Sequence, residues 1–152
     1  MIYLTISESF ASSVPEEAII TAARVALQTR QVKEDEVDLT IVFDDDVRIQ
    51  ELNRQFSGIN APTDVLSFPA NVVDPETGRL YLGDMIISVP RAQAQAVEAG
   101  LQLEEELKIL VVHGVLHLLG FDHSTDVDKK KMWATQENIL AELGIASDKL
   151  PE

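Results

Sequence analysis

The sequence contains no cysteine among its 152 residues. This absence excludes thiolate zinc sites, iron–sulfur clusters, thiol nucleophiles and disulfide bonds, so imidazole and carboxylate groups are the strong metal ligands that remain. A chain of this length buries roughly two thirds of the surface that it exposes when unfolded, and it therefore folds without a structural metal. A cluster of metal-ligating side chains in this sequence needs an explanation other than folding.

Cations are also scarce, because 12 lysines and arginines stand against 26 acidic residues, a formal net charge of −14. Such a charge repels polyanions at long range and argues against a general nucleic-acid-binding protein. Long hydrophobic runs are missing as well: no stretch approaches the ~20 apolar residues of a membrane span, and residues 1–7 lack the basic start of a signal peptide. We therefore expect a cytoplasmic protein that does not associate with membranes.

Hydrophobic periodicity predicts strands alternating with helices. The predicted strands are 2–6, 37–43, 65–68 and 81–88, and the predicted helices are 13–29, 46–56, 88–99, 103–119 and 125–143. Ser13 and Glu16 have capping-box spacing, and Asp44–Asp46 offers N-cap oxygens to the second helix. The order β-α-β-α-β-β-α-α-α predicts one mixed αβ (α+β) domain over 1–152, with helices flanking a small, mostly parallel sheet that has an antiparallel edge.

All three histidines of the chain lie between residues 106 and 123. The predicted helix that carries the first two is apolar on nearly all sides, which is typical of a buried central helix. His113 and His117 are four residues apart, so their imidazoles share one face of this helix. Gly120 then ends the helix, and a left-handed glycine there allows His123 to turn back toward the other two.

These histidines predict a metal site. Buried imidazoles without partners would each cost about 1–3 kcal/mol, so the fold must supply hydrogen bonds or a metal ion. Three neutral imidazoles favour one Zn²⁺ per chain, with Ni²⁺, Co²⁺ or Cu²⁺ as alternatives. Three ligands leave one position open for water, which is the arrangement of a catalytic site. Asp122 is the alternative fourth ligand, and its binding would favour a structural zinc.

The spacing also matches the extended zincin motif of metalloproteases, H-E-x-x-H-x-x-G-x-x-H, at all but one position. Gly114 stands where that motif has its catalytic glutamate. A glycine can neither accept a proton from a metal-bound water nor donate one to a leaving amine. Peptide hydrolysis of that type is therefore disfavoured, whereas a reaction with a less demanding leaving group stays open.

The string at 113–123, His-Gly-x-Leu-His-Leu-x-Gly-x-Asp-His, resembles the signature of the YbeY endoribonuclease family of bacterial ribosomal RNA maturation factors. Residues 63–69 and 82–88 resemble two further recurring segments of that family, in the same order. The resemblance implies a sheet flanked by helices, zinc on the three histidines, and metal-dependent cleavage of single-stranded RNA. It also implies 3′-end maturation of small-subunit ribosomal RNA and ribosome quality control, with the small ribosomal subunit and assembly factors as partners.

One position departs from the family pattern, because Ser57 follows Phe56 where the family usually has an arginine. An arginine there can hold a phosphate through two hydrogen bonds, and serine cannot replace its charge. We hypothesise that Arg54 or Arg79 partly compensates by binding substrate, or that phosphate binding at this site is weak. The alternative is that both are ordinary solvated side chains.

Three other features are interpreted structurally. Glu106 is expected to be a solvated acid in the first turn of its helix, with acceptance of an imidazole N–H as the alternative. Asp64 is expected to cap a turn. The only basic run, Lys129–Lys131, is interpreted as a solvated face, and a contact with a phosphate backbone is the alternative. The general base of the predicted reaction stays unassigned.

The sequence therefore predicts a zinc-dependent, single-strand-specific endoribonuclease. Two alternatives from other classes stay open. The first is a metal-dependent hydrolase of another substrate class, such as a zincin-like protease that lacks the usual glutamate. The second is a non-catalytic, zinc-containing ribosome assembly factor.

Overall fold

The computed structural model describes residues 1–145. Its strands and helices follow the predicted order, with two short 3-10 turns added at Glu8–Phe10 and Glu34–Glu36. In chain order they are β1 (Ile2–Ile6), α1 (Glu16–Thr29), β2 (Val37–Asp44), α2 (Asp46–Ser57), β3 (Val65–Val73), β4 (Leu80–Ser88), α3 (Val89–Ala99), α4 (Leu103–Leu118) and α5 (Asp126–Glu142).

The four strands form one mixed sheet in the order β1-β2-β4-β3. Strand β2 runs parallel to both β1 and β4, whereas β3 pairs antiparallel with β4 at the edge. The predicted fold class, a mostly parallel sheet with an antiparallel edge, is confirmed. Strand β3 is longer than predicted: its register with β4 shifts between Pro69 and Val72, and pairing resumes as far as Val73. Proline donates no hydrogen bond to a ladder, so the irregularity falls where pairing is weakest.

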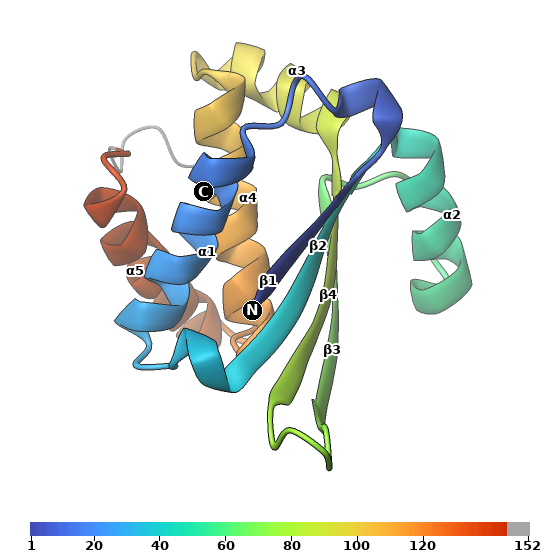
Figure 1. Ribbon diagram of the computed structural model, residues 1–152. Helices are drawn as coiled ribbons and strands as arrows, with labels where there is room; N and C mark the ends of the chain where they lie inside the picture. The colour runs from blue at the N-terminus through green and yellow to red at the C-terminus, as the bar shows by residue number, and fades with distance from the viewer. Residues whose placement is uncertain (146–152) are drawn as a thin grey trace.

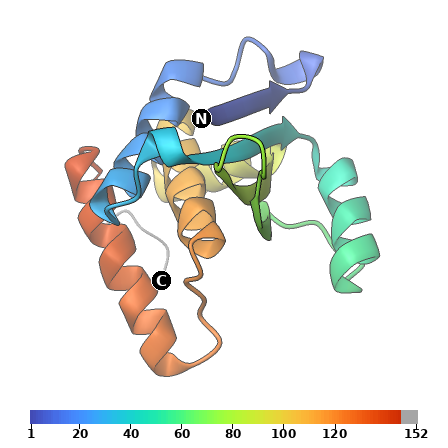
Figure 2. The ribbon, with the colours of Figure 1, turned by 60° about the horizontal axis from the view of Figure 1, so that its bottom comes forward.

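The two faces of the sheet are covered differently. Along β2, Leu39, Ile41 and Phe43 are fully buried, and helices α1, α4 and α5 lie on that side (Figures 1 and 2). Their alternate neighbours, such as Val42, face the opposite side, where α2 packs over part of the sheet. Because successive side chains of a strand point to opposite faces, this alternation directs the main core toward α4.

Several helix ends have the caps that the sequence predicts. The side chains of Asp45, Ser88 and Thr125 each accept a hydrogen bond from a backbone N–H of the first turn. The predicted capping box of α1 is wrong: the N-cap of α1 is Pro15, and no side chain caps that end. A capping box is found instead at the start of α4, where it joins Gln102 and Glu105.

Helix α4 is the central, buried helix that the sequence predicts. It packs against α1, α3, α5 and the β3–β4 edge of the sheet. Gly114 permits the close approach to β4, because a Cβ atom there would lie 2.6 Å from Cε of the buried Met85. Residues buried along α4 include Leu107, Ile109, Val111, Val112, Val115, Leu116 and Leu118. Within residues 1–145, no helix combines the length and the hydropathy that a membrane crossing requires.

Candidate metal centre

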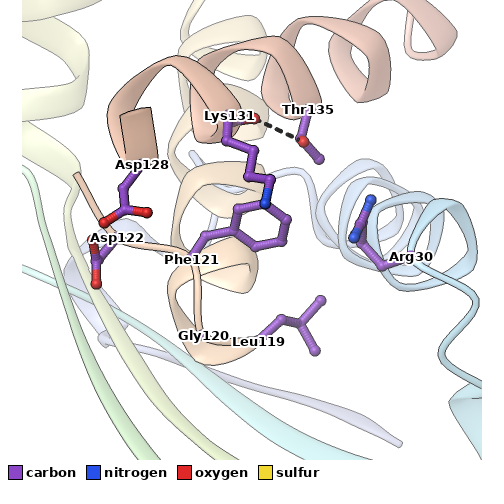
Figure 3. Close-up of a pocket in the computed structure, with 8 residues that line it drawn as sticks. All are labelled: Arg30, Leu119, Gly120, Phe121, Asp122, Asp128, Lys131 and Thr135. Carbon is purple, nitrogen blue, oxygen red and sulfur yellow. Dashed lines mark hydrogen bonds between the residues drawn. The ribbon is translucent and has the colours of Figure 1, made fainter. Parts of the chain in front are cut away.

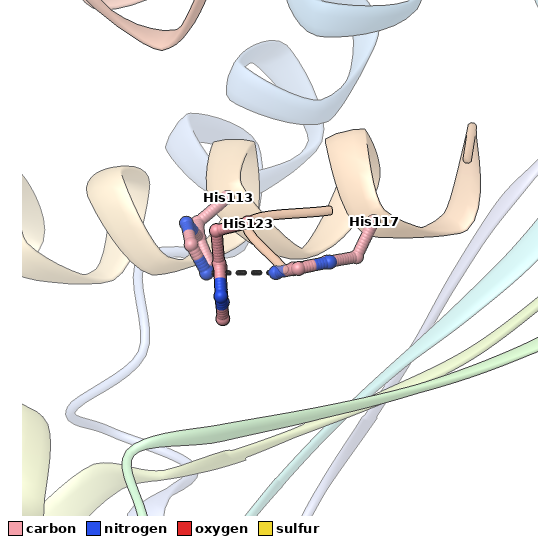
Figure 4. A group of neighbouring side chains, drawn as sticks. All are labelled: His113, His117 and His123. Atoms are coloured by element: carbon pink, nitrogen blue, oxygen red, sulfur yellow. Dashed lines mark hydrogen bonds between the residues drawn. The ribbon is translucent and has the colours of Figure 1, made fainter. Parts of the chain in front are cut away.

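The structure brings the three predicted histidines together at the end of α4. His113 and His117 extend from the last two turns of that helix, and His123 comes from the loop that follows (Figure 4). One ligand nitrogen of each lies within 4.8 Å of the others. Gly120 adopts a φ of 101° in the turn between helix and loop, which is a conformation that favours glycine. The helix end and this turn together set the position of His123.

Hydrogen bonds orient the first two imidazole rings. Nδ1 of His113 lies 2.9 Å from Oε1 of Gln136 on α5, and Nδ1 of His117 lies 3.0 Å from the carbonyl oxygen of Phe121. Both partners are acceptors, so each Nδ1 carries the proton and donates it. In a neutral imidazole, the Nε2 atom then presents a lone pair.

These residues fit a metal ion. The Nε2 atoms of His113 and His117 lie 3.0 Å apart, with two lone pairs facing each other and no proton between them. That contact is repulsive unless a cation is shared. Two nitrogens bound to one tetrahedral zinc at about 2.0–2.1 Å lie about 3.3 Å apart, close to the observed spacing. The ring of His123 completes the group, with its centroid 5.2 Å from that of His117.

Burial favours the neutral forms of His113 and His117. It lowers the pKa of His113, and it lowers the pKa of His117 to about 4, with a smaller contribution from the neighbouring His113. A group with such a pKa carries no proton on Nε2 at neutral pH. Metal binding therefore needs no proton release from His117, which lowers the cost of ligation.

A cleft of about 530 Å³ opens over the histidines. One wall is the start of β3 with the preceding Thr63 and Asp64, and the other is the loop 120–123. In residues 1–145 no aspartate or glutamate joins the cluster. The carboxylate of Asp122 instead accepts hydrogen bonds from the backbone N–H and hydroxyl of Ser124, at 3.2 and 2.9 Å. The three-histidine cluster thus faces open space.

Two acidic residues of the recurring segments occupy different places. Oδ1 of Asp64 accepts a hydrogen bond from the backbone N–H of Val65 at the start of β3, at 2.8 Å, and Asp64 also lines the cleft. Asp84 lies on the opposite face of the sheet, where it accepts a hydrogen bond from the hydroxyl of Tyr81. Of these two residues, only Asp64 is therefore placed to meet a molecule in the cleft.

The two arginines suggested as substrate contacts lie outside the cleft. Arg79 forms an ion pair with Asp38 at 2.7 Å and donates to backbone carbonyls of 35 and 37. Arg54 is exposed in the last turn of α2, and neither residue is among those that line the histidine cleft. Their proposed binding of substrate stays a prediction. Ser57 ends α2 and is also absent from the cleft wall.

Sequence reasoning missed the role of Gln136 on α5 and misjudged the burial of Glu106 on α4. Gln136 falls within the apolar face of α5, and its burial beside His113 gives it the role of orienting that ring. The sequence signal for this role was a single amide side chain within an otherwise apolar stripe of the helix.

The interpretation of Glu106 as a solvated acid is wrong, since only 4% of its surface is exposed. The alternative is not met either, because Gln136 is the acceptor for His113. Burial, and then the charge of Asp64, raises the pKa of Glu106 to about 7.

Fold and site together define a class: mixed αβ proteins in which a buried helix and its following loop present three histidines to an open cleft. The family model described as Endoribonuclease YbeY matches residues 5–144 of the chain. The chain belongs to this family, and the resemblance seen in its sequence is confirmed.

Relatives support the assignment along most of the chain. The endoribonuclease YbeY of Moorella thermoacetica is 46% identical over 143 residues, covering 87% of this chain and 90% of its own. That of Desulfitobacterium hafniense strain Y51 is 44% identical over 138 residues, covering 86% and 83%. The solution structure of a Thermotoga maritima protein superposes with a TM-score of 0.64 at 28% identity, covering 94% of this chain and 89% of that one.

Proposed function

We propose that the protein is a zinc-dependent endoribonuclease that cleaves single-stranded RNA. The observation that carries the proposal is the convergence of three histidines on one side of an open cleft, two of them with their Nε2 lone pairs held toward one point. The relatives named endoribonuclease YbeY supply the substrate class. Imidazole ligation and a free coordination position favour zinc in a catalytic role.

In this proposal the parts of the site have separate roles. When bound, zinc supplies Lewis acidity toward a phosphodiester oxygen and a lowered pKa for a coordinated water. Gln136 and the carbonyl of Phe121 hold the imidazoles in the tautomer that ligates. The start of β3 forms the opposite wall, so a single strand of RNA entering the cleft passes between β3 and the loop 120–123.

The zincin alternative is disfavoured by the packing of α4 as well as by its sequence. Gly114 faces Met85 of β4, and no side chain at that position could reach the cleft. The proton acceptor of this reaction therefore does not occupy position 114, where zincin metalloproteases carry their glutamate.

We further propose that the natural substrate is ribosomal RNA, matured at the 3′ end of the small-subunit molecule, in the cytoplasm and on ribosomal particles with their assembly factors. The formal net charge of −14 supports this context. An acidic protein gains little from long-range attraction to free RNA, so contacts with a ribosomal particle would add the missing affinity.

The test compares the wild-type protein with His117→Ala. We expect one zinc per wild-type chain, and we expect the variant to lose bound metal and to cleave a single-stranded RNA at least about 10³-fold more slowly. Zinc content would be measured by elemental analysis and cleavage by gel electrophoresis. Asn138→Ala, an exposed site on α5, is the matched control and should retain both properties.

Duplex RNA of the same sequence and casein are run beside the single strand. Cleavage of casein without cleavage of RNA would favour a hydrolase of another class. Undiminished RNA cleavage by metal-free protein, or by His117→Ala with its fold intact, would refute the proposed function and leave a structural zinc as the remaining role.

A further inference from the structure

A second hollow lies directly behind the wall of the histidine cleft. It has a volume of about 320 Å³ and is drawn in Figure 3. Gly120, Phe121 and Asp122 line both hollows, so the loop of the metal centre is a partition between them. The carbonyl of Phe121 faces the cleft side, where it orients His117, and its ring faces the second hollow (Figure 3).

An arginine lines one wall of this hollow. The guanidinium carbon of Arg30, at the end of α1, lies 5.0 Å from the centroid of the Phe121 ring. A cation–π contact of this kind uses none of the N–H groups of the guanidinium. Within residues 1–145, the Arg30 side chain makes no ion pair, and no carboxylate consumes its donors. Its N–H edge is thus available to an anion.

A second cation lines the same hollow from α5. Lys131 belongs to the basic run of that helix, and among the described residues it too has no ion-pair partner. Four other arginines of this acidic chain form ion pairs, namely Arg24, Arg48, Arg79 and Arg91, whereas Arg54, which lines neither hollow, forms none within residues 1–145. Two unpaired cations beside one hollow repel each other, and an anion between them removes that repulsion.

The hollow is polarised. Asp122 and Asp128 also line it, but they lie together at the end away from Arg30 (Figure 3). The hydrogen bonds from Ser124 to Asp122 direct that carboxylate to its own loop. The cationic end is therefore the only part of this hollow suited to a negative group.

We propose that Arg30 and Lys131 bind one phosphodiester of the RNA strand whose neighbouring phosphodiester enters the histidine cleft. The inference rests on the proposed function, which supplies RNA as the substrate. Because the partition is only the loop 120–122, a single strand can cross it and place phosphates on both sides. The guanidinium of Arg30 offers hydrogen bonds in a fixed geometry to a phosphate, and the ammonium of Lys131 offers a point charge. The hollow thus acts as a positioning site for the strand.

The test measures RNA binding in the absence of metal, so that cleavage does not enter the result. A fluorescein-labelled single-stranded RNA of ten nucleotides is titrated with chelator-treated wild-type protein, with Arg30→Gln and Lys131→Gln, and with the double variant. Lys130→Gln is the matched control, since Lys130 lies in the same run but does not line the hollow. Anisotropy is recorded over a series of salt concentrations, and thermal unfolding checks that each variant is folded.

We expect the double variant to bind about tenfold more weakly at low salt, with a salt slope smaller by about 0.7, the value for one phosphate contact on a single strand. Each single variant should show part of this loss and Lys130→Gln almost none. With zinc restored, the loss should appear as a raised KM. Affinity and salt slope equal to those of the control would overturn the proposal. Failure of the proposed function shows differently, as absence of RNA cleavage by the zinc-loaded wild type.

Discussion

The two ends of helix α4 hold ionisable side chains on the same helical face, but they hold them in different ways. Near the carboxyl end, His113 and His117 each donate Nδ1–H to an oxygen of another element. Near the amino end, Glu106 is buried, and its carboxyl group makes no hydrogen bond or ion pair within residues 1–145. Burial shifts the pKa of all three toward the neutral form.

The comparison shows what a partner adds to burial. For the histidines, the neutral form is the one that binds a metal, so burial and the hydrogen bonds act in the same direction. For Glu106, ionisation near neutral pH has only a cost, because no cation or donor stabilises the carboxylate. The carboxyl end of α4 is arranged for function, and the amino end makes stability depend on pH.

The largest effect should come from Glu106→Gln, which removes the ionisable group. The pKa of Glu106 rises from its ordinary value of 4.5 to about 7 in the folded protein. The stabilising contribution of the protonated form is full below pH about 4.5 and is lost as pH rises through about 7, which is worth about 3 kcal/mol. The variant should therefore match the wild type at pH 4.5 and be more stable by about 3 kcal/mol at pH 8.

Urea unfolding of the metal-free proteins at both pH values measures this difference. Glu98→Gln, an exposed acid on α3, is the control and should show no such dependence. A variant with the same pH dependence as the wild type would mean that Glu106 ionises as freely in the folded chain as in the unfolded one.

The next largest effect concerns Gln136, the hydrogen-bond partner of His113 near the carboxyl end of α4. Gln136→Ala removes the acceptor of Nδ1–H from His113, so the ring loses its fixed tautomer and orientation. We expect zinc affinity to fall about 10- to 100-fold. Gln136→Glu keeps an oxygen at that position and should retain affinity near that of the wild type. Competition with a chromophoric zinc chelator gives the dissociation constants, and equal affinity of the alanine variant would remove Gln136 from the site.

The smallest effect tests a charged pair far from α4. The side-chain hydrogen bond from Arg79, and then that from the terminal amino group, lowers the pKa of Asp38 to about 2. The stabilisation from this carboxylate is present above its ordinary pKa of 3.8 and is lost as pH falls through about 2. Asp38→Asn should cost about 1–2 kcal/mol at pH 7, less than the full shift implies because the pair is partly solvated.

Chemical denaturation across pH 2 to 7 should show this cost shrinking toward zero at the acid end, and the zinc affinity of the variant at pH 7 should equal that of the wild type. A constant difference across that range would assign the effect to packing instead of charge. A change in zinc affinity would connect this pair to the metal centre, against the separation seen in the structure.

Much of the fold could be predicted because it depends on local patterns. Alternating apolar residues placed β2, the spacing of apolar residues with Gly100 at its end placed α3, and Asp45 identified an N-cap. The α1 cap was missed because Pro15 takes the N-cap position and Ser13 lies outside the helix. Strand β3 was too short in the prediction because its second half pairs with β4 beyond an irregularity; the turn at 74–78 indicated a hairpin, but the alternation of residues 69–73 did not show how far the pairing extends.

The histidine spacing by itself determined that two imidazoles share a face of a helix, because helical geometry relates residues four apart wherever the helix lies. Only the tertiary structure decided which partners those side chains have. Gln136 on α5 contacts His113, and Arg30 at the end of α1 contacts the Phe121 ring. The loop after α4 brings the Phe121 carbonyl to His117. Burial and hydrogen bonding between distant segments depend on packing, and packing is a property of the whole folded chain.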